Sequence, residues 1–303
     1  MPDAHPPRGL FVGLATLDVI HRVVAAPGRN EKITATAQFV AAGGPAANAA
    51  VTFAALGGEA VLLTALGTSP IARAVVDELA GVGVRVIDIA GEYAGDPPVS
   101  AVAVTESTGD RAVVGGDAAA LVFPPPPAGE LAELAAAADV VLVDGHHPPL
   151  AVAAADAARA AGRPGVVDAG RWKPVMAELL PRVTDVVASA DFRLPGSPGT
   201  DDTMRRLVEA GTPVVVATAG SGPVRWAAGG EHGESPVPRV HAVDTLGAGD
   251  VFHGAYAHAL ARGVGVERRI AFASRVAAVR CEMIGPRSWL HAIAGIAQGE
   301  GDA

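Results

Sequence analysis

The sequence predicts an α/β fold in which a mostly parallel β-sheet is flanked by helices. Two observations predict it. Short runs of consecutive apolar residues, typical of strands buried on both faces, alternate along the chain with segments of helical periodicity. This alternation is the pattern of βαβ units around a parallel sheet. At 303 residues the chain suits either one large α/β domain with an appendage or two modest domains.

The N-terminal part predicts one buried strand followed by half-exposed β structure. Leu10 to Leu14 is an apolar run and the first buried strand candidate. Between residues 19 and 40, apolar residues such as Ile33 and Phe39 alternate with polar ones such as Lys32, as on a strand with one exposed face. This segment therefore predicts a small sheet.

The next segments return to helix and strand in alternation. A helix is predicted at 45–56, a strand at 61–65 and a helix at 69–79. Ser69 is a suitable N-cap for the last of these, because Pro70 then occupies the first helical position, where a backbone N–H is not needed.

A hairpin and a loop lead into the second half, which then repeats the same rhythm. The hairpin is predicted at 99–106 and 112–114, turning at Thr108-Gly109-Asp110, and the proline-rich loop at 124–127. Buried strands are predicted at 140–143, 165–168, 185–187 and 214–217. Long helices are predicted at 250–262, 267–281 and 286–296.

Composition excludes several classes of protein. A net charge of -9, with no basic cluster interleaved with aromatics, argues against a nucleic-acid partner. No apolar stretch is long enough for a membrane span, and Met1 to Arg8 lacks the apolar core of a secretory signal. Cys281 is the only cysteine, so no intrachain disulfide forms. These features together predict a cytoplasmic protein.

The most informative segment is Asp244-Thr245-Leu246-Gly247-Ala248-Gly249-Asp250, which joins a flexible loop to a carboxylate at the start of a predicted helix. Its glycines let successive N–H groups point at one concentrated negative charge, as at other anion sites on helix N-termini. An Asp in a first helical turn is ordinarily a capping residue. A carboxylate beside an anion site, however, repels phosphate unless it accepts a proton from a hydroxyl nucleophile, so the segment predicts phosphoryl transfer.

This segment resembles the C-terminal signature Asp-Thr-x-Gly-Ala-Gly-Asp of the ribokinase-like sugar kinases, the PfkB family. A second resemblance lies upstream in Gly43-Gly44-Pro45-Ala46-Ala47-Asn48, which is similar to the family's N-terminal Gly-Gly signature and its following Asn. Taken singly, the glycine pair indicates only a turn before a helix. Two motifs in the right order favour the family.

The resemblance covers nearly the whole chain and implies its architecture. It implies a single ribokinase-like domain over residues 1–303, with a doubly wound, mostly parallel sheet and a small β-sheet lid. Segments near 19–40 and 99–114 would supply the lid. Lid strands of this family often pair between subunits, so the resemblance also implies a homodimer.

The resemblance further implies ATP and Mg²⁺ as cofactors and Asp250 as general base, with Gly247, Ala248 and Gly249 forming an anion hole. The family counterpart of Asp244 helps to hold a monovalent cation, so Asp244 is the metal-site candidate and K⁺ its ion. An Asp that only caps the turn at a strand end is the alternative for this position.

Substrate residues are implied in the N-terminal half. Asp18 is similar to the family Asp that accepts bonds from sugar hydroxyls, Gly43 and Gly44 allow close approach, and Asn48 both donates and accepts. An ordinary surface turn is the alternative for Asp18. Lys32, and with it Arg171, is a candidate contact for an anionic substrate group.

One departure affects the choice of sugar. Many ribokinases have Lys after the glycine pair, where this chain has Pro45, which argues against the five-carbon specificity of ribokinase.

Nucleotide contacts are less well marked. The nucleotide candidates are Thr218, Gly220, Gly222, Thr245, Cys281 and Gly285. The segment from Thr218 to Gly222 resembles the family's phosphate loop, but it equally fits a glycine-rich hairpin turn. The family's Asn-x-x-Glu element is degraded here, with Asp191 as the nearest polar residue, and Cys281 alone indicates a buried apolar side chain.

The sequence thus predicts an ATP-dependent kinase that phosphorylates a primary hydroxyl of a small sugar. Residues around Asp244 and Cys281 look like ketohexokinases, and those around Gly43 and Asp250 like bacterial sulfofructose kinases, so a ketohexose or derivative is expected. A nucleoside kinase of the same family and a non-catalytic sugar-binding regulator are the alternatives.

Overall fold

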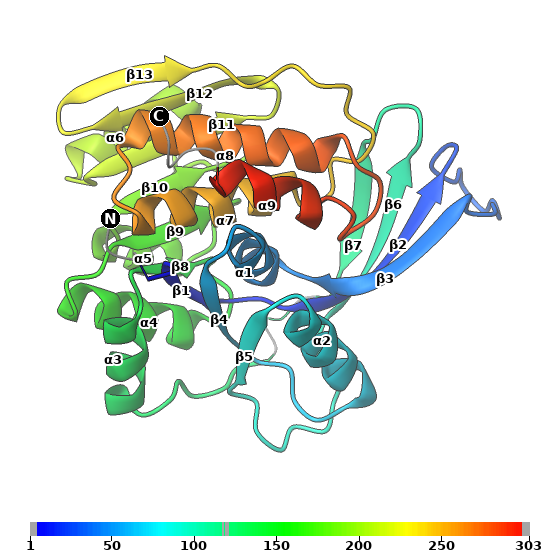
Figure 1. Ribbon diagram of the computed structural model, residues 1–303, viewed down its shortest axis with the longest axis horizontal. Helices are drawn as coiled ribbons and strands as arrows, with labels where there is room; N and C mark the ends of the chain where they lie inside the picture. Colours follow the sequence, from blue (N-terminus) through cyan, green and yellow to red (C-terminus); the bar gives the residue numbers. More distant parts are fainter. Residues whose placement is uncertain (1–4, 117, 119–120, 299–303) are drawn as a thin grey trace.

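The computed structural model describes residues 5–116, 118 and 121–298, and its centre is one large sheet (Figure 1). The first four residues of the Met1 to Arg8 segment lie outside the described residues. The large sheet consists of β1 (Arg8–Val12), β4 (Glu59–Thr64), β5 (Val84–Asp88), β8 (Val140–Val143), β9 (Gly165–Ala169), β10 (Asp185–Ala188), β11 (Val214–Ala219), β12 (Gly222–Ala228) and β13 (Glu231–Ser235). Its order is β13-β12-β11-β10-β9-β8-β1-β4-β5, and all pairs except β11–β12 and β12–β13 are parallel.

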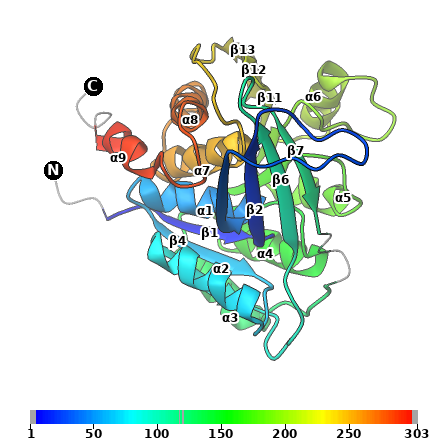
Figure 2. The same ribbon diagram turned by 90° about the vertical axis from the view of Figure 1, so that its right-hand side faces the viewer.

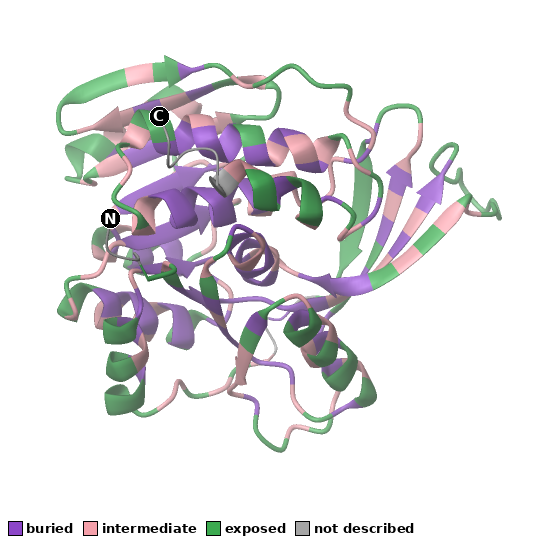
Figure 3. Ribbon diagram, viewed as in Figure 1, coloured by how far each residue is buried: buried purple, intermediate pink, exposed green. Residues whose placement is uncertain are grey.

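Helices cover both faces of this sheet because its strands are apolar on both sides. In β1, Phe11 belongs to one hydrophobic core while Leu10 and Val12 belong to the other. The first core contains α1 (Pro45–Ala55), α2 (Pro70–Gly81), α7 (Ala248–Ala261), α8 (Val266–Cys281) and α9 (Leu290–Gln298). The second contains α3 (Ala128–Ala137), α4 (Pro148–Ala160), α5 (Met176–Leu179) and α6 (Thr200–Glu209). Figure 3 shows α1, α7 and the central strands as the most buried part.

A second sheet stands at one end of the molecule, and Figure 2 faces it. It consists of β2 (Thr16–Val23), β3 (Ala37–Gly43), β6 (Val99–Thr105) and β7 (Arg111–Gly115), in the order β3-β2-β6-β7. The β2–β3 and β6–β7 pairs are antiparallel, whereas β2 and β6 are parallel. These strands overlap the segments at 19–40 and 99–114 from which a lid was expected, and we call this sheet the small sheet.

The predicted fold class is confirmed, with a mostly parallel central sheet, flanking helices and a small second sheet. Ser69 caps α2 as predicted, its Oγ accepting a hydrogen bond from the N–H of Ala72 at 3.2 Å. Two element predictions were wrong. Residues 24–36 form a connection without strand, and the last helix begins at Leu290 rather than at Pro286. The side chain of Arg287 is held by Glu78 and Ala42 across the molecule, and these contacts fix the turn that precedes α9.

Within the described part of the chain, every helix is too short or too polar to cross a membrane.

Candidate active site

The candidate site lies at the carboxyl edge of the large sheet, between the adjacent strands β1 and β8. The chain builds the sheet outward from β1 in opposite directions, through β4 to β5 and through β8 to β11, so this is the switch point at which open α/β sheets bind ligands. Asp144 follows β8 here and accepts bonds from the N–H groups of Leu14 at 2.9 Å and Ala46 at 3.2 Å. One buried carboxylate thereby holds the loop after β1 against the start of α1.

The Gly43-Gly44 pair lies where β3 of the small sheet passes into α1. Gly44 has φ 97°, and a Cβ there would lie 2.4 Å from the carbonyl oxygen of Leu14, so only glycine fits. A Cβ on Gly43 would lie 2.0 Å from Oδ2 of Asp18. Asp18 is 9% exposed, and its Oδ1 accepts a bond from the hydroxyl of Thr16 at 2.7 Å. The pair therefore makes room for a carboxylate that faces the site.

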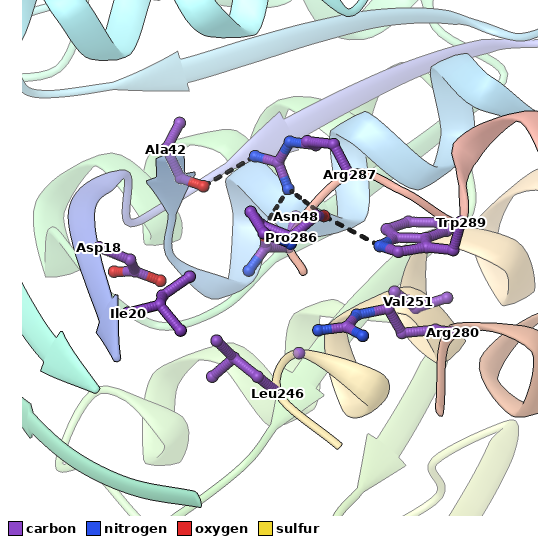
Figure 4. A pocket seen from close by; sticks show the side chains of 11 residues that line it. Asp18, Ile20, Ala42, Asn48, Leu246, Val251, Arg280, Pro286, Arg287 and Trp289 are labelled. Carbon is purple, nitrogen blue, oxygen red and sulfur yellow. Dashed lines mark hydrogen bonds between the residues drawn. The ribbon is translucent and has the colours of Figure 1, made fainter. Parts of the chain in front are cut away.

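Asn48 and Asp250, which are 202 residues apart in sequence, meet across this site. The side-chain Nδ2 of Asn48 in α1 donates a hydrogen bond to Oδ2 of Asp250 in α7 at 2.9 Å. The contact exists because α1 and α7 pack directly against each other in the core. Asp18, Asn48 and Gly247 line one pocket (Figure 4). Its remaining lining residues are Ile20, Ala42, Leu246, Val251, Arg280, Pro286, Arg287 and Trp289.

Burial, together with the negative charge of Asp168, raises the pKa of Asp250 from 3.8 to about 6. The hydrogen bond from Asn48 and the charges of His253 and Arg111 act in the opposite direction. Burial likewise raises the pKa of Asp18, against hydrogen bonds from Thr16 and Ser100 and the charge of Arg287. The pKa of Asp250 thus lies close to neutral pH, far above that of an ordinary carboxyl group.

The loop before Asp250 ends in a left-handed residue. Gly247 is the N-cap of α7 with φ 71°, and Ala248, Gly249 and Asp250 form the first turn. A helix N-terminus reached through a left-handed glycine presents several N–H groups to one point, the arrangement that favours an anion. The four predicted catalytic residues are therefore adjacent. Gly247 lines the pocket that contains Asp18 and Asn48, and Asp250 is hydrogen-bonded to Asn48.

Asp244, at the other end of the same loop, is 3% exposed and surrounded by donors. Its Oδ1 accepts the N–H of Leu246 at 3.0 Å, and its Oδ2 accepts the N–H of Gly285 at 3.1 Å. The guanidinium of Arg280 lies 3.1 Å from the same Oδ2, forming a buried ion pair. Gly285, predicted as a nucleotide contact, binds Asp244 in this structure.

Thr245 connects the loop to the small sheet. Its hydroxyl donates to the carbonyl of Gly109, in the turn between β6 and β7, at 2.8 Å, and its N–H reaches the same carbonyl at 3.1 Å. Arg111 at the start of β7 donates to the Thr245 hydroxyl at 3.4 Å. The hairpin turn of the small sheet is therefore bound directly to the loop at 244–250, which we call the anion loop.

The other nucleotide candidates are more scattered. Thr218 donates to the carbonyl of Ala188 at 3.4 Å, so it lies at the same sheet edge as the site, at the end of β11. Gly220 lies in the tight turn between β11 and β12, and Gly222 begins β12, so this segment is the hairpin that the sequence left as an alternative. Cys281 ends α8, and burial raises the pKa of its thiol.

Three polar candidates lie outside the pocket lining. Lys32 is exposed in the connection between β2 and β3, Arg171 is exposed after β9, and Asp191 is exposed in the turn after β10.

Four charged residues of the site were missed by the sequence reasoning. Arg280 binds Asp244, and Arg287 bridges Glu78, Ala42 and, at 3.4 Å, Oδ1 of Asn48. Asp168, at the end of β9, faces His253 at 3.4 Å, and Asp144 follows β8. For the two aspartates a signal existed, because carboxylates at the ends of parallel strands converge at one sheet edge. For the two arginines, no local sequence pattern indicates which residues they contact.

Comparison with known proteins bears on what this site does. The model of the pfkB family of carbohydrate kinases matches residues 9–292. Among curated proteins, a ribokinase from Arabidopsis thaliana is 27% identical over 303 residues, covering 93% of this chain and 78% of that protein.

Solved structures give the same fold. A provisionally assigned ribokinase from Agrobacterium tumefaciens superposes with a TM-score of 0.84 at 26% identity, over 98% of this chain and 99% of that one. The structure of Arabidopsis thaliana ribokinase with ribose and ATP superposes with a TM-score of 0.74 at 21% identity, over 96% and 99% of the two chains.

Proposed function

The chain belongs to the pfkB family of carbohydrate kinases, and we propose that it transfers the γ-phosphoryl group of ATP to a primary hydroxyl of a ketohexose or a ketohexose derivative, with Asp250 as general base. ATP-dependent phosphorylation of a sugar follows from the family, whereas the sugar and the residue roles are the proposal. One observation carries it: the hydrogen bond between Asn48 and Asp250, which ties a carboxylate of raised pKa to a residue of the pocket that Asp18 also lines.

The proposed role of Asp250 follows from its environment. A sugar hydroxyl is a poor nucleophile near neutral pH, and a base with a pKa near the operating pH assists it most. In the transfer, the hydroxyl oxygen bonds to the γ-phosphorus and the bond from that phosphorus to the β-phosphate oxygen breaks. ADP leaves, and the hydroxyl proton passes to Asp250. Burial keeps the pKa of Asp250 near 6, so the group is mostly ionised at neutral pH yet basic enough to take the proton.

The loop from Leu246 to Gly249 would bind the phosphoryl group as it transfers. The transition state spreads negative charge over its peripheral oxygens, which preorganised backbone N–H groups stabilise. The described residues include no group of three or more His, Cys, Asp or Glu able to hold a metal ion. Mg²⁺ would therefore be bound through the nucleotide phosphates and water, and it would neutralise the β- and γ-phosphate charge.

Sugar binding is assigned to Asp18 and Asn48, with the small sheet as a lid. Both side chains line the pocket, and together they offer the donor and acceptor pairs that polyols require. The contact between Gly109 and Thr245 supports a lid that closes on the phosphoryl site. Homodimerisation through this sheet and a cytoplasmic location stay predictions.

Ribose is the second candidate substrate. The curated relative at 27% identity is a ribokinase, and the structure of Arabidopsis thaliana ribokinase was solved with ribose and ATP. Pro45, where many ribokinases have Lys, supports the ketohexose instead. A nucleoside acceptor has less support, because Trp289 is the one aromatic residue among those lining the pocket.

The test is ADP release with ATP and Mg²⁺ across fructose, tagatose, sulfofructose, 2-keto-3-deoxygluconate, ribose and adenosine. The proposal predicts the highest kcat/KM for one of the ketoses or keto-sugar derivatives. A kcat/KM for ribose that exceeds all others by about tenfold or more would replace the ketohexose with a pentose, since that ratio corresponds to about 1.4 kcal/mol of transition-state binding. Turnover with adenosine alone would contradict the sugar assignment.

A further inference from the structure

Arg280 lies beneath the anion loop as a buried cation. Its side chain is 2% exposed, and its guanidinium points toward the loop that carries Leu246 (Figure 4). Three oxygen atoms converge on it: Oδ2 of Asp244 at 3.1 Å, the carbonyl of Asp244 at 3.3 Å and the carbonyl of Met283 at 2.9 Å. A carboxylate and two carbonyls are also the kind of ligands that a hard cation takes in proteins.

These oxygen atoms are already occupied, which leaves no place for a monovalent ion at Asp244. Both carboxylate oxygens of Asp244 already accept backbone N–H groups, from Leu246 and Gly285, and Oδ2 also accepts from the guanidinium. The Arg280 and Asp244 side chains are only 2% and 4% exposed, so a second cation beside them would meet a positive charge with little water to screen it. The prediction of K⁺ at Asp244 therefore conflicts with the contacts of this residue.

We propose that the guanidinium of Arg280 replaces the monovalent cation, and that the chain is a K⁺-independent kinase whose positive charge beneath the anion loop is covalently built in. The proposal rests on the proposed function, because it assigns a role within that site. Arg280 acts as a positioning residue through Asp244 and touches no reacting atom. An arginine cannot dissociate or lose its proton under working conditions, so the charge would be permanent.

The route from Arg280 to the reaction is short. Arg280 fixes Asp244, and Asp244 fixes the N–H of Leu246, the residue directly before the left-handed Gly247. On the other side, Asp244 also holds the N–H of Gly285. Without a cation here, the buried negative charge of Asp244 would be uncompensated, and it would repel the phosphate bound at the anion loop. The loop would then lose the geometry that a transition state of phosphoryl transfer needs.

The first measurement is a K⁺ titration of the wild-type enzyme. ADP release is followed with the sugar that gives the highest kcat/KM in the panel, from zero to about 100 mM KCl. Tetramethylammonium chloride keeps the ionic strength constant so that screening does not change. The proposal predicts a kcat that changes by less than about twofold. A K⁺-specific rise of about fivefold or more in wild-type kcat would overturn it.

The second measurement asks whether removal of the guanidinium creates a need for K⁺. Arg280→Met keeps the apolar stem but not the charge, so its kcat without K⁺ should fall by about tenfold or more and should recover severalfold with KCl. Arg280→Lys keeps a fixed cation and should show no K⁺ response. Arg268→Met removes an exposed arginine from the same helix and should match the wild type. A folded Arg280→Met enzyme that KCl does not activate would contradict the proposal.

A readout without turnover separates this proposal from the proposed function. Thermal melting is measured in KCl and in tetramethylammonium chloride at equal ionic strength. A K⁺-specific rise in the melting temperature is expected for Arg280→Met and not for the wild type, because only the variant has a free cation site. If Arg280→Met does not fold, a K⁺-specific stabilisation of the wild type overturns the proposal and its absence, together with K⁺-indifferent Arg280→Lys, supports it. Absence of kinase activity, in contrast, would count only against the proposed function.

Discussion

Asp244 and Asp250 lie at opposite ends of one loop, and their two carboxylates have opposite electrostatic environments. Asp244 receives a guanidinium and two backbone N–H groups. Asp250 receives a hydrogen bond from Asn48, while burial and the like charge of Asp168 raise its pKa. The negative charge of Asp244 is therefore compensated, whereas the ionised form of Asp250 is disfavoured.

Position in a motif therefore does not determine the role of a carboxylate. A compensated carboxylate is a structural ion, because protonating it would leave Arg280 without a counter-charge. A carboxylate of raised pKa is a better proton acceptor, but its ionised form lowers the free energy of unfolding.

The largest effect is expected for Asp250→Asn. The amide keeps the shape of the side chain and a hydrogen bond with Asn48, but it accepts no proton, so kcat should fall by about 10³-fold. Sugar affinity, measured by calorimetry, should change little because Asp18 and Asn48 remain. Turnover within about tenfold of the wild type would show that Asp250 is not the base.

The second effect concerns stability at Asp244. Asp244→Asn leaves the guanidinium of Arg280 buried without a counter-charge, which should lower the free energy of unfolding by about 3 kcal/mol. Urea denaturation followed by circular dichroism measures it. Asp202→Asn breaks an ion pair with Arg205 at the surface and is the matched control, with a much smaller loss expected. An Asp244 variant as stable as that control would contradict the structural role.

The third effect is a shift in pH dependence. In the wild type, kcat/KM should rise with pH through about 6, because the rate requires the ionised form of Asp250. Asn48 donates a hydrogen bond that favours this ionised form, so Asn48→Ala should raise the pKa of Asp250 and move the acid limb to higher pH. A pH–rate profile at saturating ATP measures the shift. An unmoved limb would mean that a different group titrates.

The smallest effect is expected for Asp191→Ala. Asp191 occupies the place of the family's degraded Asn-x-x-Glu element, but its side chain is exposed in the turn after β10. Its removal should change kcat by less than about twofold, since a solvated surface carboxylate contributes little to a distant charge. A loss of about tenfold or more in an Mg²⁺ titration would instead assign it a part in holding the metal.

The contrast also shows what the sequence could predict. The α/β class and the buried strands followed from apolar runs, because strands covered on both faces need them. The β12–β13 hairpin was missed, although the Gly229-Gly230 turn between its strands was a usable signal. The connection at 24–36 was taken for strand because alternation alone does not show whether a segment has a pairing partner.

Motif residues were found where the signal is local, and their partners were not. Gly247 and Asp250 were recognisable from seven consecutive residues, but the approach of Asn48 to Asp250 depends on the packing of α1 against α7. Arg280 lies 36 residues beyond Asp244, on a helix whose pattern gives no sign of a buried charge. The sequence therefore predicted two aspartates in one loop and left out the arginine that separates their roles.

The most direct test is the free energy of unfolding of Asp250→Asn and Asp244→Asn, measured side by side with the wild type at pH 8. Because the folded-state pKa of Asp250 is raised to about 6, the native protein binds more protons than the unfolded chain between about pH 4 and 6, and stability falls as pH rises through that window. At pH 8 the neutral Asn should therefore stabilise the protein by up to about 3 kcal/mol, a gain that disappears near pH 4. Asp244→Asn should lie below the wild type. Opposite signs are the predicted result, and two variants that are destabilised alike would contradict the account.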